Sequence, residues 1–366
     1  MIRSSLVTCA LMMVAGLPGI SSRAVAHDHL LPLGDGHLSS VPKVGYLLDC
    51  QTRFRRRGGA THSGPWIKGD EWNPAEKPAV QGNVTWPNSR ITITVEGDHR
   101  VIRANNLPKH ATGIFPIRPT DPAYQYDRNP NSIQPQRILL TLPANPVVSA
   151  TPSCVPMGMI GFATDGVAIF NAVDAGGRDA VAHEVQDKCH GHPEHNGQYH
   201  YHGPSPCMPN EMTSGLVGYA LDGFGIYGMK NPKTGKIMHD SDLDACHGIT
   251  SPVMWNGKLT DIYHYVLTPE YPYTIGCFRG QVNPALLRYG HSGGGMRESR
   301  GRPSRGDPQQ TLTRAAASLG IPVDRLRAAL GPPPPDFERA AKQLGISAQQ
   351  LRDALRSART QADASQ

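Results

Sequence analysis

The feature that most constrains the fold of this chain is an internal duplication. Gly161-Phe162-Ala163-Thr164-Asp165-Gly166 recurs 57 residues later as Gly218-Tyr219-Ala220-Leu221-Asp222-Gly223. At the same offset, Asp187-Lys188-Cys189-His190-Gly191 recurs as Asp244-Ala245-Cys246-His247-Gly248. Ordered matches at one offset predict two copies of a single unit, packed as a pseudo-symmetric pair.

The match continues beyond an insertion in the second copy. Tyr199-His200-Tyr201-His202 corresponds to Tyr263-His264-Tyr265-Val266, and Cys207 corresponds to Cys277. The two copies therefore span about 161–207 and 218–277.

The content of glycine and proline favours short strands joined by turns. The 366 residues include 39 Gly and 33 Pro, well above the combined share of about 12% in average proteins. This excludes a long-helix or coiled-coil protein and a parallel α/β enzyme. Residues 83–86 and 90–96 show the alternation of half-buried strands, and residues 137–142 are a further strand candidate. We expect a mainly β fold, with a duplicated strand-rich unit, disulfides and a small α-helical C-terminal tail.

The N-terminus has the layout of a secretory signal. Arg3 precedes an apolar stretch from Leu6 to Ile20, and Ala24-Val25-Ala26 fits a cleavage site. The apolar stretch is short for a membrane anchor, so we expect a periplasmic or secreted protein with no transmembrane span after residues 1–26 are removed. Cleavage there would expose His27-Asp28-His29, a sequence that can chelate copper(II) through the free amine.

The cysteines agree with export. Cys9 lies in the signal, which leaves six, and an even number in an exported chain indicates disulfides. Six cysteines allow fifteen connectivities. The repeat favours bridges within each copy, and the remaining pair then belongs to the N-terminal part. The expected bridges are Cys189–Cys207, Cys246–Cys277 and Cys50–Cys154.

The C-terminal tail contains a second, helical repeat. Residues 315–330 recur at an offset of 25 as 340–355, and each copy resembles two short helices separated by glycine. We therefore expect a polar lead at 27–79, a β domain at 80–290, a flexible linker at 291–310 and two helical hairpins at 311–358. The tail is a candidate for contact with a protein or an envelope component.

The charge distribution argues against nucleic acid as a partner. The formal net charge is +6, but residues 297–366 hold 12 Arg or Lys against 7 acidic residues, so the rest of the chain is nearly neutral.

The candidate chemistry lies in a run of histidines. Because strand residues two apart share a face, His200 and His202 are expected to point together and to offer two imidazoles to one ion. His190 or a carboxylate would supply a third donor. His192 and His195, in a Pro/Glu/Asn loop, are interpreted as solvated side chains. Imidazole-rich ligation suits copper or zinc.

Further candidates come from the matched positions of the two copies. His247 and His264 keep two of the histidines, although Val266 replaces the fourth residue of the motif and leaves it open whether copy two is active. Asp165 and Asp222 precede glycine and are either turn residues or carboxylates near the histidines.

The motifs resemble those of the YHYH-domain family, a group of mostly exported bacterial proteins. The resemblance rests on 197–203, 221–228 and 271–280, and covers about residues 80–280. Asn105-Asn106-Leu107-Pro108-Lys109-His110 also resembles the family pattern and adds His110 to the candidates. The family implies no established activity.

Three functions remain open at this point. The first is an exported metal-binding protein. The second is a metal-dependent hydrolase or oxidoreductase, in which the ion would activate water or a substrate. The third is a disulfide-stabilised structural or adhesive envelope module. The sequence has no G-x-S-x-G, H-E-x-x-H or P-loop motif.

Overall fold

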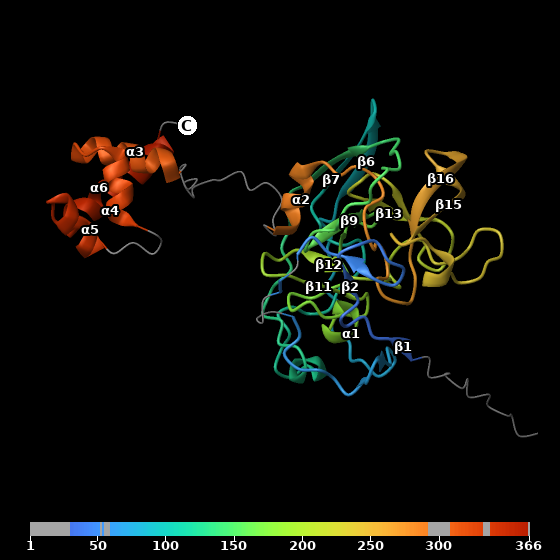
Figure 1. Cartoon of the computed structure of the whole chain (residues 1–366). Helices are drawn as coiled ribbons and strands as arrows, with labels where there is room; N and C mark the ends of the chain where they lie inside the picture. Colours follow the sequence, from blue (N-terminus) through green and yellow to red (C-terminus); the bar gives the residue numbers. More distant parts are fainter. Residues whose placement is uncertain (1–29, 52, 55–58, 292–307, 332–336, 365–366) are drawn as a thin grey trace, which may run out of the picture. The chain divides into compact units, whose positions relative to one another are not determined.

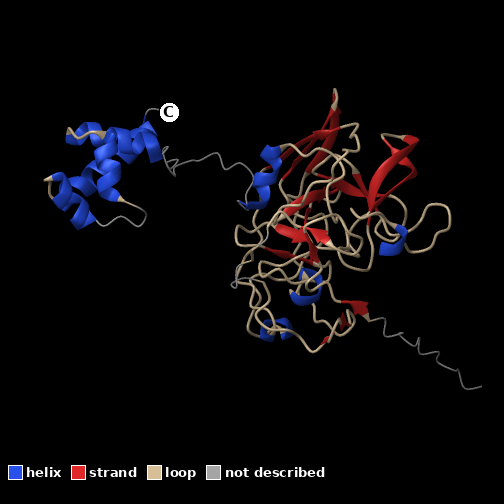
Figure 2. Ribbon diagram, in the orientation of Figure 1, coloured by secondary structure: helices blue, strands red, loops and turns tan. Residues whose placement is uncertain are grey.

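The computed structural model describes residues 30–51, 53–54, 59–291, 308–331 and 337–364. The expected signal at 1–26, the His27 chelate and most of the expected linker lie outside these residues. The described chain divides into a strand-rich unit, which holds the red strands of Figure 2 together with a few short blue helices, and a helical unit. The fold is strand-rich, as expected.

An eight-stranded sheet forms the centre of the strand-rich unit (Figure 1), in the order β11-β12-β10-β9-β13-β14-β16-β15. Its first half consists of β9 (Met159–Ala163), β10 (Ala168–Phe170), β11 (Gly191–Pro193) and β12 (Tyr199–Tyr201). Its second half consists of β13 (Leu216–Ala220), β14 (Gly225–Tyr227), β15 (Gly248–Trp255) and β16 (Lys258–Val266).

The strand order follows the sequence repeat. Each half has an antiparallel hairpin, then a parallel pair, then an antiparallel edge strand. The halves meet where β9 pairs antiparallel with β13, and Phe162 lies opposite its repeat equivalent Tyr219. This symmetric register is what two copies of one unit give when their first strands pair.

Glycine is required at this junction. A Cβ on Gly218 would lie 2.6 Å from the Phe162 carbonyl oxygen, and one on Gly161 would lie 3.0 Å from that of Tyr219. The repeated glycine at the start of each copy therefore allows the two backbones to approach closely.

Smaller elements surround the central sheet. One group of strands is β1 (Leu31–Pro32), β4 (Ile67–Lys68) and β5 (Glu71–Trp72); another is β2 (Leu38–Ser39) and β3 (Leu47–Leu48); a third is β6 (Ile91–Glu96), β7 (His99–Ala104) and β8 (Ile138–Pro143). The short helices are η1 (Pro122–Gln125), α1 (Ala180–His183), η2 (Asp240–Asp242) and α2 (Pro284–His291).

The described residues before residue 80 pack within the strand-rich unit. The sequence predicted a polar lead for this segment. Trp66 and Trp72 are buried with Val80, Ala182 and Val185. The indole N–H of Trp66 donates to the Ala182 carbonyl at 2.8 Å, which ties this segment to α1.

Three disulfides cross-link the unit, Cys50–Cys154, Cys189–Cys207 and Cys246–Cys277. These are the pairs expected from the repeat.

The helical unit contains α3 (Pro308–Leu319), α4 (Val323–Leu330), α5 (Phe337–Leu344) and α6 (Ala348–Ala364). Its core is built from small and branched apolar residues, including Ala316, Leu326 and Leu351. Gly320 and Gly345, both with positive φ, follow the first helix of each pair.

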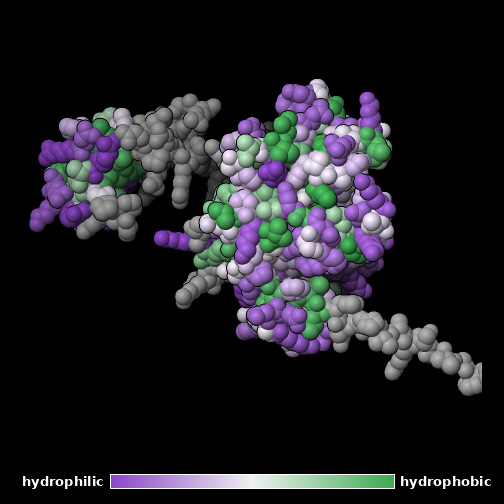
Figure 3. Space-filling view, turned by 45° about the vertical axis from the view of Figure 1, so that its right-hand side comes forward, coloured by the Kyte–Doolittle hydropathy of each residue, from purple (hydrophilic) through white to green (hydrophobic). Residues whose placement is uncertain are grey.

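The surface drawn in Figure 3 mixes hydrophilic and hydrophobic residues in small patches over the strand-rich unit. None of the helices in the described part of the chain combines the length and apolar character needed to cross a bilayer.

Candidate metal centre

Strand β12 turns its tyrosines to one face of the sheet. The hydroxyl of Tyr199 donates to Asp187 Oδ1 at 2.9 Å, and that of Tyr201 donates to Asp165 Oδ2 at 2.7 Å. All four side chains are buried. The tyrosine face is thus satisfied by internal hydrogen bonds, which explains why aspartate and tyrosine recur together in the repeat.

The opposite face carries His200, and His202 follows directly. Their Nε2 atoms lie 3.1 Å apart, as the strand period predicts. His192 joins them because β11 pairs antiparallel with β12 and places His192 opposite His200. The nearest ring nitrogens of these three side chains lie within 4.8 Å of one another. We call His192, His200 and His202 the histidine cluster.

The hydrogen bonds of His200 and His202 indicate which of their nitrogen atoms are free. His200 Nδ1 lies 2.9 Å from the Gln198 carbonyl oxygen, and His202 Nδ1 contacts the Asn171 carbonyl oxygen. A carbonyl only accepts, so each Nδ1 carries a proton, and the neutral form of each ring has its lone pair on Nε2. The two Nε2 atoms face each other at 3.1 Å, a spacing at which two lone pairs repel unless a proton or a metal ion lies between them.

Burial favours the neutral form of His192 and His200, which is the form that binds metals. The three side chains of the cluster are 2–4% exposed. Burial, together with the neighbouring imidazoles, lowers the pKa values of His192 and His200 well below the usual value.

Glu184 brings a carboxylate to the cluster. Its Oε2 lies 3.4 Å from His192 Nε2 and 3.3 Å from His202 Nε2. Both Glu184 Oε2 and His192 Nε2 are buried without a hydrogen-bond partner, which is rare for buried polar atoms unless a ligand completes them. Glu184 directly follows α1, and its backbone N–H caps the helix by donating to the Ala180 carbonyl oxygen.

Three of the six distances between these donor atoms are close to the edges of a tetrahedral site. A tetrahedron with metal–donor bonds of about 2.0–2.1 Å has edges of about 3.3–3.4 Å. The pairs involving Glu184 measure 3.3 and 3.4 Å, and the His200–His202 pair measures 3.1 Å. The group whose ligand atoms all lie within 4.8 Å of one another consists of the three histidines, so the Glu184 carboxylate would have to shift to complete a tetrahedron.

A cavity of about 620 Å³ adjoins the four donors, all of which contribute to its wall. Phe170 also lines it and stacks on His200, with ring centroids 3.8 Å apart. Stacking and the carbonyl hydrogen bond together hold the His200 ring in place.

The second copy has lost the corresponding donors. His264 occupies the position of His200, and its Nδ1 lies 2.9 Å from the Ile262 carbonyl oxygen. However, Ile249 lies opposite it in the sheet, where the first copy has His192. Val266 replaces His202, and Ser241 matches Glu184 at the repeat offset. Val266 instead packs with Met238, Leu243 and Ile249 in an apolar cluster.

The other predicted donors lie outside the histidine cluster. His190 Nδ1 is hydrogen-bonded to the Pro204 carbonyl oxygen at 2.9 Å, on an exposed turn. His190 therefore does not join His200 and His202 as the expected third donor, and His192 takes that place in the cluster. His247 is buried, with Nε2 3.0 Å from the Thr268 hydroxyl.

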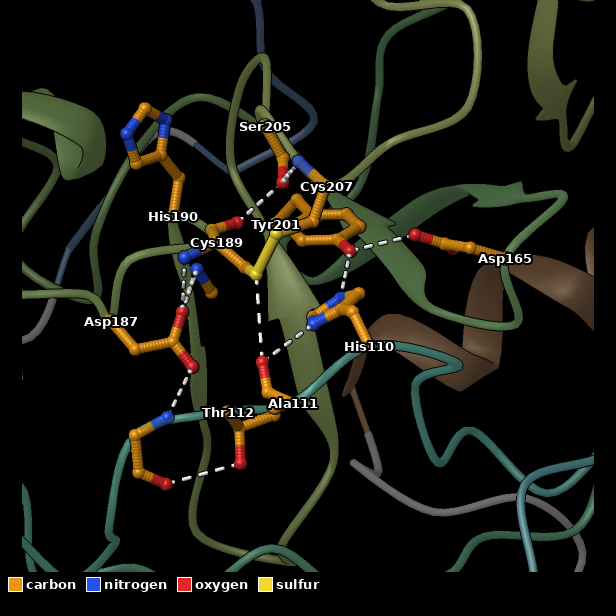
Figure 4. The surroundings of a disulfide bond; sticks show 12 residues. His110, Ala111, Thr112, Asp165, Asp187, Cys189, His190, Tyr201, Ser205 and Cys207 are labelled. Atoms are coloured by element: carbon orange, nitrogen blue, oxygen red, sulfur yellow. Dashed lines mark hydrogen bonds between the residues drawn. A yellow bond between two sulfur atoms is a disulfide. The ribbon is translucent and has the colours of Figure 1, made fainter. Parts of the chain in front are cut away.

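His110, Tyr201 and Asp165 form a hydrogen-bonded chain beside the Cys189–Cys207 disulfide (Figure 4). His110 Nε2 lies 2.6 Å from the Tyr201 hydroxyl. Both cysteine sulfurs near His110 are bridged, so they are not available as ligands. In copy two, Asp222 accepts hydrogen bonds from the Tyr265 hydroxyl at 2.6 Å and from the Gly280 N–H. Asp165 and Asp222 therefore serve as buried acceptors for tyrosine.

Sequence reasoning missed His192 and Glu184. His192 is buried on β11, not solvated as expected, whereas the side chain of His195 is 78% exposed. The Asn196-Gly197 turn was the available signal, because such a turn joins two strands of a hairpin and would place His192 opposite His200. No pattern marked Glu184, which follows a helix of four residues.

Comparisons with known proteins identify one family. Residues 139–239 match the family model described as "YHYH protein", a range that covers the first copy and the beginning of the second. No curated protein and no solved structure matches the chain. On this match, the segment that carries the histidine cluster belongs to the YHYH protein family.

Proposed function

We propose that this chain is an exported metal-binding protein whose ion, copper or zinc, is held by His192, His200, His202 and Glu184. The observation that carries the proposal is the pair of Nε2 atoms 3.1 Å apart in a buried site, on rings whose Nδ1 atoms contact carbonyl oxygens. Without an ion, this arrangement costs energy through lone-pair repulsion and two unsatisfied polar atoms. With an ion, every one of these atoms gains a partner.

The donor set supports the choice of metal. Three imidazoles and one carboxylate suit zinc and copper(II), whereas oxygen-rich sites suit calcium and magnesium. Three of the donor–donor distances, 3.1, 3.3 and 3.4 Å, are close to the edges of a tetrahedral zinc site. Export is supported by the three disulfides, because such bridges persist in oxidising compartments, and by the predicted signal segment.

Metal quantitation tests the proposal. Protein purified from the periplasm, or reconstituted with zinc or copper after chelation, should contain about one ion per chain, in line with four donors forming one site. The double variant His200→Ala/His202→Ala should lose this ion, and His264→Ala, the matched change in copy two, should retain it. An unchanged metal content in the double variant would contradict the proposal.

A further inference from the structure

The wall of the 620 Å³ cavity includes the whole donor set. Structural zinc sites are closed by four protein donors and surrounded by protein, whereas sites that bind exogenous ligands face open space. Ligand-binding pockets are commonly about 300–1,000 Å³ in volume. An ion held at this wall would therefore have one side directed into a space of substrate size.

We infer that the metal ion directly binds a small molecule that enters this cavity and coordinates through an oxygen atom. The inference rests on the proposed function, and it adds the class of molecule that the ion binds and the cavity in which that molecule lies. The three histidines form the group of mutually close ligand atoms, and a zinc ion with three protein donors keeps a position for an exogenous ligand and can expand to five-coordinate.

The charge around the cavity selects the class of ligand. Four carboxylates, those of Asp127, Asp174, Glu184 and Glu194, line it together with one guanidinium, that of Arg128. Asp174 is paired with the Arg178 guanidinium at 2.6 Å, so the other three carboxylates balance Arg128 and a divalent ion. A cavity with no net positive charge offers phosphates and other anions no attraction and admits neutral or cationic molecules.

The rest of the wall adds an apolar component. Met157, Phe170 and Val173 line the cavity near the donors. The ligand is therefore an uncharged or cationic, partly apolar molecule with at least one oxygen donor, such as a carbonyl compound.

Cobalt(II) makes the inference measurable, because its visible absorption reports the number and type of its ligands. The full chain is loaded with cobalt(II), and cobalt content is measured. Acetohydroxamic acid, which is uncharged in solution at neutral pH, is then titrated in as an oxygen-donor probe, and inorganic phosphate is titrated separately. The inference predicts a saturable spectral change with the first probe and at least about tenfold weaker binding of phosphate.

Variants at the cavity wall separate ligand access from metal binding. Ala175 and Thr61 are exposed residues that line the cavity and contribute no donor. Ala175→Trp and, independently, Thr61→Trp should keep the cobalt but weaken probe binding at least about tenfold, since the indole fills the space. Ala285→Trp, at an exposed position outside the cavity wall, is the matched control and should bind the probe as the unmodified protein does.

The outcomes distinguish this inference from the function on which it rests. Failure to bind cobalt in the unmodified protein would contradict the metal site itself. Cobalt binding with a spectrum that the probe leaves unchanged would overturn only the cavity inference. Equal affinity for phosphate, or unchanged probe binding in a folded Trp variant, would also overturn it. If one Trp variant fails to fold, the other decides.

Discussion

The contacts of each imidazole decide whether it can serve as a ligand. His200 and His264 occupy matched positions, and each places Nδ1 2.9 Å from the carbonyl oxygen two residues earlier. Both therefore present a free Nε2. Only His200 has other donors around it, because the neighbours of His264 are Ile249 and Val266. The same hydrogen bond to the backbone therefore orients a candidate ligand in the first copy and a packed side chain in the second.

Replacing Glu184 tests the fourth donor. Glu184→Gln keeps the size of the side chain but removes its charge, so the dissociation constant for zinc should rise by at least about tenfold. Competition with a chromophoric chelator measures this constant. Glu194→Gln, which also lies on the cavity wall but contacts His195, is the control. Equal effects of the two changes would exclude Glu184 as a ligand.

His247 makes stability depend on pH without any metal. Burial lowers the pKa of His247 to about 3, below its value of about 6.5 in unfolded chains. Between these values the unfolded state binds one more proton, so stability falls as the pH drops through this window. Asparagine tolerates the positive φ of 71° at this position. When the pH falls from 6.5 to 5, the free energy of unfolding of His247→Asn should therefore decrease by about 2 kcal/mol less than that of the unmodified protein. Urea unfolding at both pH values measures the difference, and parallel losses would refute the assignment.

At the scale of the elements, the two faces of strand β12 differ in their contacts: one carries tyrosines that bond to aspartates, and the other carries candidate metal ligands. The tyrosine face joins the sheet to buried aspartates, and copy two has the matching pairs Tyr263 with the half-buried Asp244 and Tyr265 with the buried Asp222. On the histidine face, the Nε2 atoms face the other donors of the site, and the described residues offer them no tyrosine or aspartate partner of this kind. Structure and metal binding thus depend on alternate residues of one short strand.

The tyrosine face is expected to affect stability and not metal binding. Tyr201→Phe and Tyr265→Phe each leave a buried aspartate without its hydroxyl partner, which should lower the free energy of unfolding by about 1–3 kcal/mol. Denaturation in urea measures the loss, and the zinc content of both variants should stay at that of the unmodified chain. A Tyr201→Phe protein of normal stability that lacks zinc would contradict this division.

Two features of the site and the fold could be predicted from the sequence, through the strand period and the repeat. The shared direction of His200 and His202 follows from a period of two, and the disulfide pairs follow from the matched cysteines. The third and fourth donors depend on tertiary structure. His192 reaches the site through the register of a hairpin, and Glu184 through the end of a four-residue helix. Neither register nor a short helix end leaves a periodic signal.

At the scale of the whole molecule, all the proposed chemistry belongs to one half of one unit. The donors come from β11 and β12 and from the residues that immediately follow α1 and β12, and the other half of the sheet contributes a symmetric neighbour through the pairing of β9 with β13. The helical unit has its own apolar core. Divergence of two matched halves explains how a symmetric sheet can carry a single site.

Removing the helical unit tests this separation. A chain that ends at Arg300 keeps every donor and the three disulfides, so its zinc content and its urea midpoint for the strand-rich unit should match those of the full chain. The helical unit on its own should bind no zinc. Loss of zinc from the shortened chain would show that the tail takes part in the site.

Anomalous diffraction tests the central claim most directly. Crystals of the protein, grown after exposure to zinc or copper, would be measured on both sides of the absorption edge of the metal. The account predicts one strong anomalous peak among His192, His200, His202 and Glu184, at about 2.0–2.2 Å from each donor atom. A peak bound elsewhere, or no peak while these four side chains keep their positions, would contradict it.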